Sequence, residues 1–587
     1  MMEQRNLIAA ILLSVAIVLG FQFLVQKPRI EQQQAAHQQA ISQNAPSLAT
    51  PQAPSTPSAP TPQATNAPSA SAPLDRAEIL RESPRVMIDT PRVQGSIALR
   101  GARFDDLTLV QYRETIDPNS PHITLLTPAG MPDAYFADAG WTAAAGVGIK
   151  MPDKDTMWQA DRMTLTPSTP VTLTWDNGQG LRFVTTYSVD DAYMISIDKR
   201  VENSSAAAVT LFPYARVSRN GNPPESSYYI LFEGPLGVFN KTLKEIKYKE
   251  LQKEPVNVTT TGGWLGFTDK YWLVAVVPDQ NMPVSAHFSD DAKSGQNAYQ
   301  AYFVSTAGLT AAPGESVESR SMIFAGAKEV KLLNAYQDNL GIERLSYAID
   351  WGWFFFLTKP IFLLLDWLYK HVGNFGIAIL LLTVIIKGLF FPLANKSYRA
   401  MSKLKKLQPE MMKIRERFGD DRERMNKEMM ELYKREKANP TAGCLPIFIQ
   451  IPVFFSLYKV LFVTIEMRHA PFYGWIRDLS APDPTSVLNL FGLLPAWTLP
   501  DSLSILPVAI LAIGVWPIIM GVTMFLQQKL NPAPADPVQA KMFMILPVVF
   551  TFMLAKFPAG LVIYWTWNNL LSIAQQWVIM RRAGVKP

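Results

Sequence analysis

The chain has 587 residues, which exceeds one ordinary domain. It is 48% apolar with a mean hydropathy of +0.06, an average over strongly apolar runs and a long polar insert. The net charge of +6 is mild for this length, and the single cysteine, Cys444, excludes an internal disulfide.

The amino-terminal end predicts a membrane anchor. Leu7 to Val25 form an apolar run that is preceded by Arg5 and is long enough to span a bilayer. A cleaved signal peptide is the alternative, but Gln22–Lys27 offers no small-x-small cleavage site. We therefore expect an uncleaved transmembrane signal anchor over residues 1–26, with its amino end inside the cell. A disordered Gln/Ala/Pro/Ser-rich tether is expected over residues 27–83.

Residues 84–328 have the pattern of an all-β domain. Val171–Trp175, Leu181–Tyr187 and Tyr193–Asp198 largely alternate apolar and polar residues, and Asp176–Gly180 supplies a turn between the first two. Frequent Gly, Pro and Asn breaks between such runs predict a large antiparallel sandwich.

The β domain carries no recognisable catalytic pattern. His122 and His287 lie near no motif, and the segment has neither metal-ligand spacing nor a glycine-rich phosphate loop. A carboxylate pair assembled in space stays open as an alternative. We expect a structural or docking role, no enzymatic activity, no metal, no cofactor and no specific nucleic-acid site.

Residues 329–372 predict a linker and an interfacial amphipathic helix. Trp351–Lys370 is nearly long enough to span a bilayer and is rich in Trp and Tyr, which favour membrane interfaces. The excess of Lys and Arg between Lys396 and Lys437 marks that later segment as cytoplasmic, which requires two crossings before it. A helix lying flat on the outer side fits this count. Its charged residues fall on one helical face: Lys359, Asp366 and Lys370.

Residues 373–394 predict transmembrane helix 2, which contains one fixed cation, Lys387. A charge at membrane depth costs at least about 2.5–3.5 kcal/mol. Thr383 lies one turn earlier on the same face. Two interpretations remain: Lys387 snorkels toward the cationic end that begins at Lys396, or it faces a wet cavity.

Residues 395–444 predict a cytoplasmic helical hairpin, broken at Gly419–Asp421 and ended at Asn439–Pro440. An ordinary self-packed hairpin is one interpretation. The other is a capture surface for varied apolar partners, because flexible thioethers adapt to many shapes. The methionines in question are Met401, Met411, Met412, Met425, Met429 and Met430.

The remaining apolar runs predict transmembrane helices 3 to 6 at residues 445–465, 505–526, 542–557 and 560–580, with an outer loop over 466–504. This number of crossings leaves the carboxyl end inside the cell, which agrees with the positive-inside rule for Arg581 and Arg582.

Polar residues recur on these helices. Asn568, Ser572 and Gln575 lie at i, i+4 and i+7, while Thr523 and Gln527 share a face of another helix and Gln450 lies on a third. Interhelical hydrogen bonding is the simple explanation. Because four helices supply polar groups, one of them a cation, we favour a wet cavity in which Lys387 is functional.

Taken together, these segments resemble the YidC-type membrane protein insertases of the Oxa/Alb superfamily, in the Gram-negative arrangement with a large periplasmic domain. The resemblance is densest at Gly373–Gly376, Gly388–Leu393, Leu407–Pro409, Arg415–Asp421, Asn439–Pro446, Ala470–Pro484, Met520–Met524 and Phe557–Tyr564.

The resemblance implies a polytopic α-helical membrane protein with six transmembrane helices, five of which form the insertase core. It also implies a periplasmic β-supersandwich similar to sugar mutarotase folds but without their activity. The core would hold a client-binding groove open to cytoplasm and lipid. Its residues would be Lys387, Thr383, Gln450, Tyr458, Thr523, Gln527, Tyr564, Trp565, Asn568, Ser572 and Gln575.

The implied partners are nascent membrane proteins, the Sec translocon, the ribosome with its signal-recognition targeting machinery, and the lipid bilayer. The implied location is the inner membrane, with both termini cytoplasmic. The chain departs from the family pattern in four places. Lys387 stands where many relatives have Arg, and Trp565 where Tyr is common; the loop over 485–504 is longer, and the basic carboxyl tail is short.

Two other classes of membrane protein share some of these features. A secondary transporter also places a cation in a midplane cavity, but such folds usually contain paired repeats with broken helices. A membrane-tethered periplasmic enzyme would need a catalytic motif in the β domain.

Overall fold

The computed structural model describes residues 76–144, 148–221, 231–291, 297–419, 421–436, 438, 445–486, 489, 491, 513–531, 537–582 and 584. Several predicted segments lie outside the described residues: the anchor over 1–26, most of the tether, the hairpin end at Asn439–Pro440, most of the loop over 485–504 and the first residues of the crossing at 505–526.

The predicted tether was too long at its carboxyl end. A short helix, α3 (Arg76–Arg81), precedes the first strand, and its Ile79 is buried. Arg76 also forms an ion pair with Asp106 of the β domain. One buried apolar residue and one ion pair therefore attach this end of the tether to the folded domain, which composition alone did not reveal.

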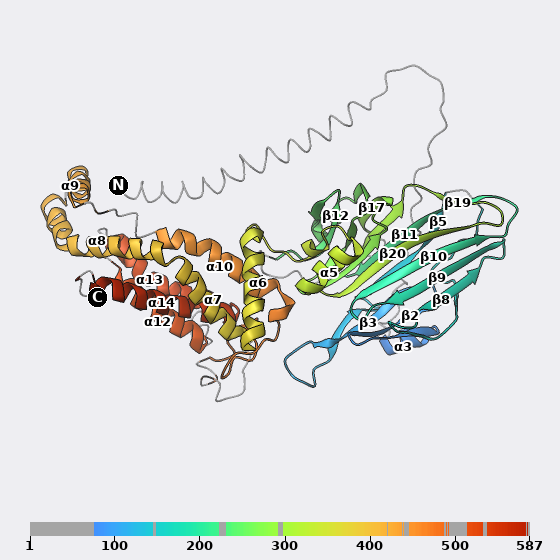
Figure 1. The fold of residues 1–587 in the computed structure, drawn as a ribbon, viewed down its shortest axis with the longest axis horizontal. Coiled ribbons are helices and arrows are strands. Elements are labelled where there is room, and N and C mark those ends of the chain that lie inside the picture. Colours follow the sequence, from blue (N-terminus) through green and yellow to red (C-terminus); the bar gives the residue numbers. More distant parts are fainter. Residues whose placement is uncertain are drawn as a thin grey trace, which may run out of the picture. The chain divides into compact units, whose positions relative to one another are not determined.

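The β domain consists of two large, mainly antiparallel sheets whose inner faces share one hydrophobic core (Figure 1). In the described residues the first sheet follows the order β14 (Val256–Thr261), β17 (Pro283–Asp290), β18 (Ala298–Ser305), β11 (Val209–Asn220), β5 (Tyr135–Ala143), β3 (Arg103–Arg113), β2 (Val93–Ala98), β1 (Arg85–Asp89), β7 (Thr164–Leu165), with β4 (His122–Leu126) beside β3 and β19 (Leu309–Ala311) beside β11.

The second sheet follows the order β13 (Thr242–Glu245), β12 (Gly234–Phe239), β15 (Trp264–Thr268), β16 (Trp272–Pro278), β20 (Ser316–Ala327), β10 (Met194–Asn203), β9 (Leu181–Val189), β8 (Val171–Asp176), β6 (Gln159–Ala160). A one-turn helix, α4 (Tyr248–Leu251), follows β13. The three runs that alternate apolar and polar residues are β8, β9 and β10, and β8 pairs with β9 across the predicted turn.

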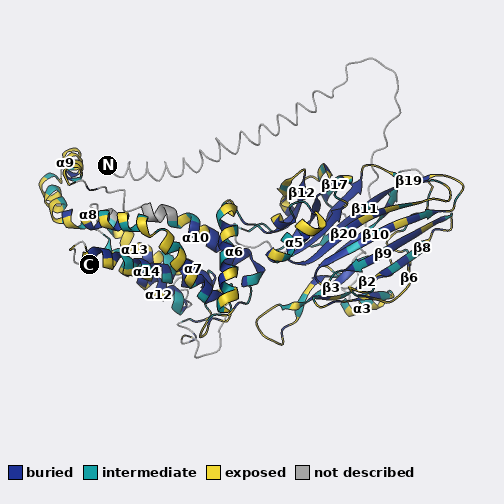
Figure 2. Ribbon diagram, viewed as in Figure 1, coloured by how far each residue is buried: buried dark blue, intermediate teal, exposed yellow. Residues whose placement is uncertain are grey.

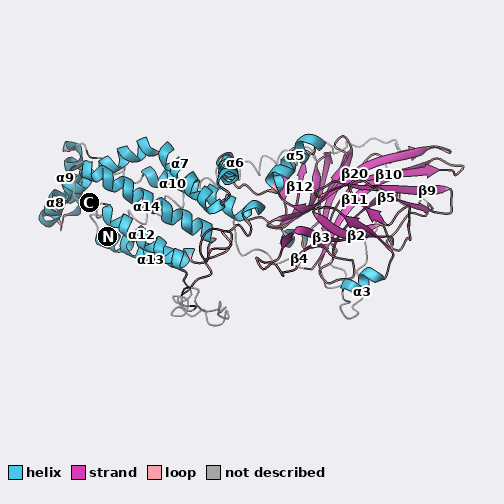
Figure 3. Ribbon diagram, turned by 60° about the horizontal axis from the view of Figure 1, so that its bottom comes forward, coloured by secondary structure: helices cyan, strands magenta, loops and turns pink. Residues whose placement is uncertain are grey.

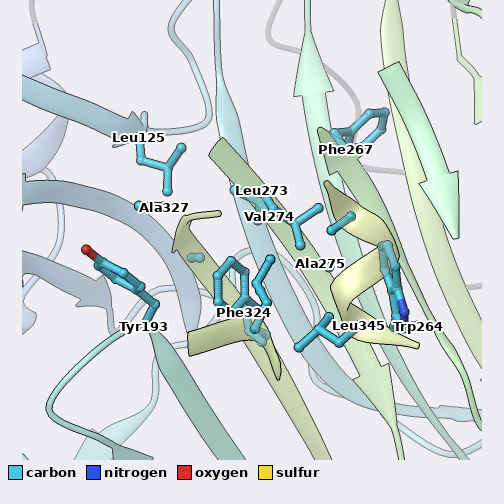
Figure 4. Close-up of a cluster of buried hydrophobic side chains, with 14 of the residues drawn as sticks. Leu125, Tyr193, Trp264, Phe267, Leu273, Val274, Ala275, Phe324, Ala327 and Leu345 are labelled. Carbon is cyan, nitrogen blue, oxygen red and sulfur yellow. The ribbon is translucent and has the colours of Figure 1, made fainter. Parts of the chain in front are cut away.

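The linker after the last strand packs on the second sheet. Helix α5 (Val330–Leu340) and the 3-10 turn η2 (Leu345–Ala348) bury Leu333, Tyr336 and Leu345. Figure 4 shows Leu345 among the buried side chains of this core, with Trp264 and Phe324. The Trp264 indole also donates a hydrogen bond to the Glu343 carbonyl at 3.2 Å. Apolar burial and a satisfied indole N–H thus fix the linker to the sheet.

Helix α6 (Phe355–Val372) covers the predicted interfacial segment and runs across the direction of the helices that follow (Figure 1). Its polar stripe faces α5, because Asp366 pairs with Lys331 at 2.6 Å and Lys359 donates to Asn334 at 3.4 Å. Large apolar side chains on α6 remain exposed, namely Phe355, Phe356, Leu363 and Trp367.

The helical region continues with α7 (Phe375–Leu389), α8 (Phe391–Phe418), α9 (Arg422–Arg435), α10 (Leu445–Val463), the 3-10 turn η4 (Ile465–Met467), α12 (Val515–Leu530), α13 (Pro537–Leu554) and α14 (Ala559–Arg582). Helix α14 packs against α7, α8, α10 and α12, while α13 packs on α12 (Figure 3). Helix α14 is therefore the central element of this region.

The helix predicted over 373–394 is not one straight element. It ends at Leu389, and α8 starts at Phe391 after a bend of 69° with Pro392 in its first turn. Proline is favoured there because it needs no amide partner in the first turn of a helix. Among the described residues, no single helix meets a length and hydropathy criterion for crossing a bilayer, and the bent pair α7–α8 meets it jointly.

Burial separates the two regions of the chain (Figure 2). The interiors of the sheets are buried, whereas α9 is largely exposed. Lys199 is one of the buried cations of the β domain, with an exposed fraction of 1%. Its Nζ donates to the Tyr214 carbonyl at 2.9 Å and lies near Asp138, which is itself paired with Arg216 at 3.0 Å. Burial lowers the pKa of Lys199 to about 7.

This buried ammonium predicts a pH-dependent stability. Because the folded-state pKa lies below the usual 10.5, the free energy of unfolding should rise as the pH increases from about 7 toward 10. Replacing Lys199→Met should remove that rise and increase thermal stability at pH 7, since methionine has no charge to desolvate. Thermal unfolding of the full chain followed by circular dichroism measures both effects.

The exposed Lys244→Met is the matched control and should change neither quantity. A Lys199→Met protein that is less stable at pH 7 and keeps the pH slope would contradict this assignment.

Candidate functional site

Lys387 lies in the last turn of α7 and points toward α14. Its Nζ donates a hydrogen bond to the Ser572 hydroxyl at 2.8 Å, and that hydroxyl donates to the Asn568 carbonyl at 2.8 Å. Ser572 is buried, and the described residues place no carboxylate in an ion pair with Lys387. The cation is therefore held by a neutral partner from the neighbouring helix.

Helix α14 presents a column of polar side chains to the centre of the helical region. Asn568 and Ser572, which share a helical face by their spacing, are buried there. Two neighbours that the spacing did not single out also belong to the column. Asn569 donates to the Thr523 hydroxyl on α12 at 3.2 Å, and Gln576 donates to Asn531 at 3.1 Å. The i, i+4, i+7 pattern found one stripe of this face and missed the adjacent one.

Several of these polar atoms have no partner in the described part of the chain. They are Asn568 Oδ1, Gln575 Nε2, Gln576 Oε1 and Gln528 Oε1, all shielded from bulk solvent. A buried amide group left without a hydrogen bond costs about 1–3 kcal/mol. Three of these four groups lie on α14 and Gln528 lies on α12. Such a concentration is typical of a site that holds water or receives a polar ligand.

A second polar contact lies nearer the amino-terminal end of α14. Gln450 of α10 donates to the Tyr564 hydroxyl, so these two predicted residues meet. Trp565 packs edge-on against Phe454 at 4.6 Å. The tryptophan thus fills an aromatic contact between α10 and α14.

Aromatic side chains gather near the amino-terminal end of α14. Tyr458 stacks on Phe462 at 5.6 Å and lies 5.5 Å from Phe557. Phe472 lies on Gly376, where an added Cβ would come within 1.9 Å of its ring. Glycine is required at 376 because any side chain would displace this ring. We call Tyr458, Phe462, Phe472 and Phe557 the aromatic closure.

Two residues that were predicted for the groove, Thr383 and Gln527, form no hydrogen bond with the Lys387–Ser572 pair in the described residues. Thr383 is buried and donates to the Ile379 carbonyl of its own helix at 2.7 Å. This back-bonding satisfies its hydroxyl without a groove partner. Gln527 is half-buried on α12, and no hydrogen bond joins it to the Lys387 cluster in the described residues.

A cavity of about 810 Å³ opens between α7, α8 and α14 next to Lys387. Its walls include Val384, Phe391 and Val578, and Gln575 also lines it. Positively charged side chains line this cavity, and the spacing of polar residues did not predict them. Three of these cations recur at helical spacing on α8. These cations, with Lys387, are Arg399, Lys403, Lys406 and Arg582.

The hairpin buries part of its methionine set. Met401 and Met429 are buried, and Met425 is half-buried. Met411 is half-buried against the hairpin's own apolar residues. Met412 and Met430 are exposed at 60% and 52%. Any surface for apolar partners on the hairpin therefore centres on these last two residues. No group of three or more His, Cys, Asp or Glu suited to a metal ion occurs among the residues that the structure describes.

Comparisons with known proteins cover nearly the whole chain. A family model described as "YidC periplasmic domain" matches residues 85–364, and one described as "60Kd inner membrane protein" matches residues 367–586. Proteins named "Membrane protein insertase YidC" from Beijerinckia indica and Agrobacterium fabrum are 52% and 50% identical, each match covering 100% of this chain and 97% of the relative. A solved structure titled as an active YidC insertase is 17% identical, with a TM-score of 0.35, and covers 84% of this chain and 92% of its own.

The groove geometry predicts where water reaches α14. In a Cys444→Ser background, Gln575→Cys should react rapidly with a membrane-impermeant maleimide, because position 575 lines the cavity and thiolates form only where water is present. Leu570→Cys, on the same helix and 41% exposed but outside the cavity, should react at least about tenfold more slowly because it would face lipid. Labelling rates in sealed vesicles measure the difference, and equal rates at both positions would exclude a one-sided aqueous groove.

Proposed function

The chain belongs to the YidC family of membrane protein insertases, and we propose that it inserts its clients through the groove around Lys387. It is an inner-membrane protein with a periplasmic β-rich domain and a helical insertase region. The observation that carries the proposal is the Lys387–Ser572 contact beside a cation-lined cavity.

The proposed mechanism is thermodynamic and needs no nucleotide. A client's polar or acidic flank enters the wet groove and is attracted by Lys387, which shortens the low-dielectric distance that the flank must cross. Dehydration of polar groups is the main barrier to that crossing. The client's apolar segment then moves sideways into lipid, where burial of its surface completes the process. The groove makes no covalent bond, and we infer that the protein is not an enzyme.

The proposed topology has six crossings and both termini in the cytoplasm. The anchor over 1–26 is the first, and the helices at 373–394, 445–465, 505–526, 542–557 and 560–580 form the five-helix core. Exposed apolar side chains on α7, α12 and α13 support this arrangement, because such a surface is unfavourable in water. They include Leu381, Ile385, Val522, Phe525, Phe543 and Ile545.

The hairpin α8–α9 is proposed as the site of first contact with a client leaving the ribosome. Its exposed Met412 and Met430 can adapt to different apolar segments. In the proposed scheme, the ribosome, the signal-recognition targeting machinery and the Sec translocon are the partners that deliver or share clients.

Reconstitution distinguishes this function from the alternatives. The purified protein in liposomes should insert a single-span client without ATP. Flux of a small solute without insertion would indicate a transporter, and turnover confined to the β domain would indicate a tethered enzyme.

The charge of Lys387 should matter according to the client. Lys387→Ala should slow insertion of a client with an acidic translocated tail by about tenfold, about 1.4 kcal/mol in barrier, and leave a neutral tail nearly unaffected. Lys387→Arg should retain activity because the cation remains. Lys387→Glu should be slower than Lys387→Ala for the acidic tail, since like charges repel in a partly dehydrated site. Insertion rates of paired clients that differ only in tail charge provide the measurement.

Equal slowing of acidic and neutral tails by Lys387→Ala would refute the attraction mechanism and leave hydration of the groove as the role of Lys387. Unchanged rates for both tails would support the snorkelling interpretation.

The two exposed methionines should carry client capture. The double variant Met412→Ser/Met430→Ser should reduce photo-crosslinking of ribosome-bound clients to the hairpin severalfold, because it removes the adaptable apolar surface. Helix content should stay unchanged, since neither side chain is buried. Lys413→Ser/Glu431→Ser, at neighbouring exposed positions, is the control. If both double variants crosslink like the parent chain, capture does not use these residues.

A further inference from the structure

The cytoplasmic end of the cavity carries a concentration of positive charge that client attraction to Lys387 does not require. Four cations lie there in addition to Lys387: Arg399, Lys403, Lys406 and Arg582. No Asp or Glu is among the described residues that line the cavity. Within the described chain, Arg399, Lys403 and Arg582 form no ion pair with a carboxylate. We call Arg399, Lys403 and Arg582 the cationic rim.

The lining supplies hydrogen-bond donors to a negatively charged ligand. Lys and Arg are donors only, and Gln575 adds an Nε2 group that is shielded from solvent without a partner among the described residues. Cations gathered at one opening repel one another, so an anion between them is favoured on electrostatic grounds. Phosphate oxygens suit this donor set, because Arg and Lys both bind phosphate through charge-assisted hydrogen bonds.

The walls next to the cationic rim are apolar and open to the outside of the helical region. Val384, Phe391 and Val578 line the cavity, and they are 46%, 50% and 41% exposed. A free inorganic anion makes no use of such walls. A ligand with an anionic head and hydrocarbon chains uses both features, since its chains would cover apolar surface that otherwise stays exposed.

The place of the rim in the sequence matches the membrane boundary. The apolar helix α7 ends at Leu389, and the rim cations of α8 follow the bend at Phe390, while Arg582 ends α14. Cations directly beyond an apolar span lie at the level of lipid headgroups on the cytoplasmic side. Basic pockets between helices at that level are suited to acidic lipid headgroups.

We propose that this cavity binds one anionic phospholipid of the cytoplasmic leaflet. The phosphate lies between Arg399, Lys403 and Arg582, and an acyl chain covers Val384, Phe391 and Val578. The site adjoins Lys387 but does not require client insertion, so its test is a binding measurement that can fail or succeed independently of the insertase mechanism.

The test uses the full chain in detergent micelles and native mass spectrometry with added phosphatidylglycerol. The parent chain should hold one phosphatidylglycerol at least about tenfold more tightly than phosphatidylcholine, a difference of about 1.4 kcal/mol. The triple variant Arg399→Gln/Lys403→Gln/Arg582→Gln should lose that preference. The control Lys413→Gln/Lys427→Gln/Lys434→Gln removes the same charge from exposed hairpin positions outside the cavity and should keep it.

A second variant tests the apolar walls and guards against misfolding of the triple variant. Gly388 lines the cavity, and a Cβ built there meets no atom within 4 Å. Gly388→Leu should therefore fold normally and lower phosphatidylglycerol binding severalfold by occupying acyl-chain space.

Three results would overturn the proposal. Equal loss of preference in the rim and control variants would indicate a general charge effect. Displacement of the lipid by glycerol phosphate at equal concentration would indicate a site for the anion alone. Displacement by an acidic peptide at equal concentration would assign the cavity to polypeptide.

Discussion

The helical region is arranged around the cost of one ammonium group placed among apolar helices. In the proposed topology Lys387 lies at membrane depth, where a charge is costly, so its surroundings must supply polar contacts. The Ser572 hydroxyl provides one at 2.8 Å, and a single neutral partner does not replace a hydration shell. The unpartnered amide atoms of α14 and the adjoining cavity follow from the same requirement. The rest of α14 then holds this polar stripe in position by packing against α7, α10 and α12.

The β domain accommodates a buried lysine differently. It buries Lys199 with two backbone carbonyls and a nearby Asp138–Arg216 pair. Burial of that lysine shifts its pKa downward. A lysine side chain thus carries a desolvation cost in the β domain, whereas in the helical region it requires polar surroundings.

Local patterns in the sequence predicted the elements better than their assembly. Alternation and a Gly-containing turn sufficed for the β8–β9 hairpin, because both strands and the turn are contiguous. The pairing of β10 with β20 joins strands that are distant in sequence, and no local signal specifies it. The stripe of Asn568 and Ser572 followed from helical spacing, whereas the contribution of Arg399 and Lys403 required the bend at Phe390. Thr383 shows the limit of spacing arguments, since its hydroxyl binds its own helix.

The aromatic closure has an electrical consequence. In the proposed groove, water extends from the cytoplasm toward α14, so the membrane voltage cannot fall evenly across the full bilayer. Most of it must fall over the thin dry layer formed by Tyr458, Phe462, Phe472 and Phe557. Each elementary charge that crosses this layer gains or loses about 2.3 kcal/mol per 100 mV. In the proposed topology this layer would act as an insulator against ion leakage. It would also concentrate the field on a client's acidic flank at the point where that flank leaves the groove.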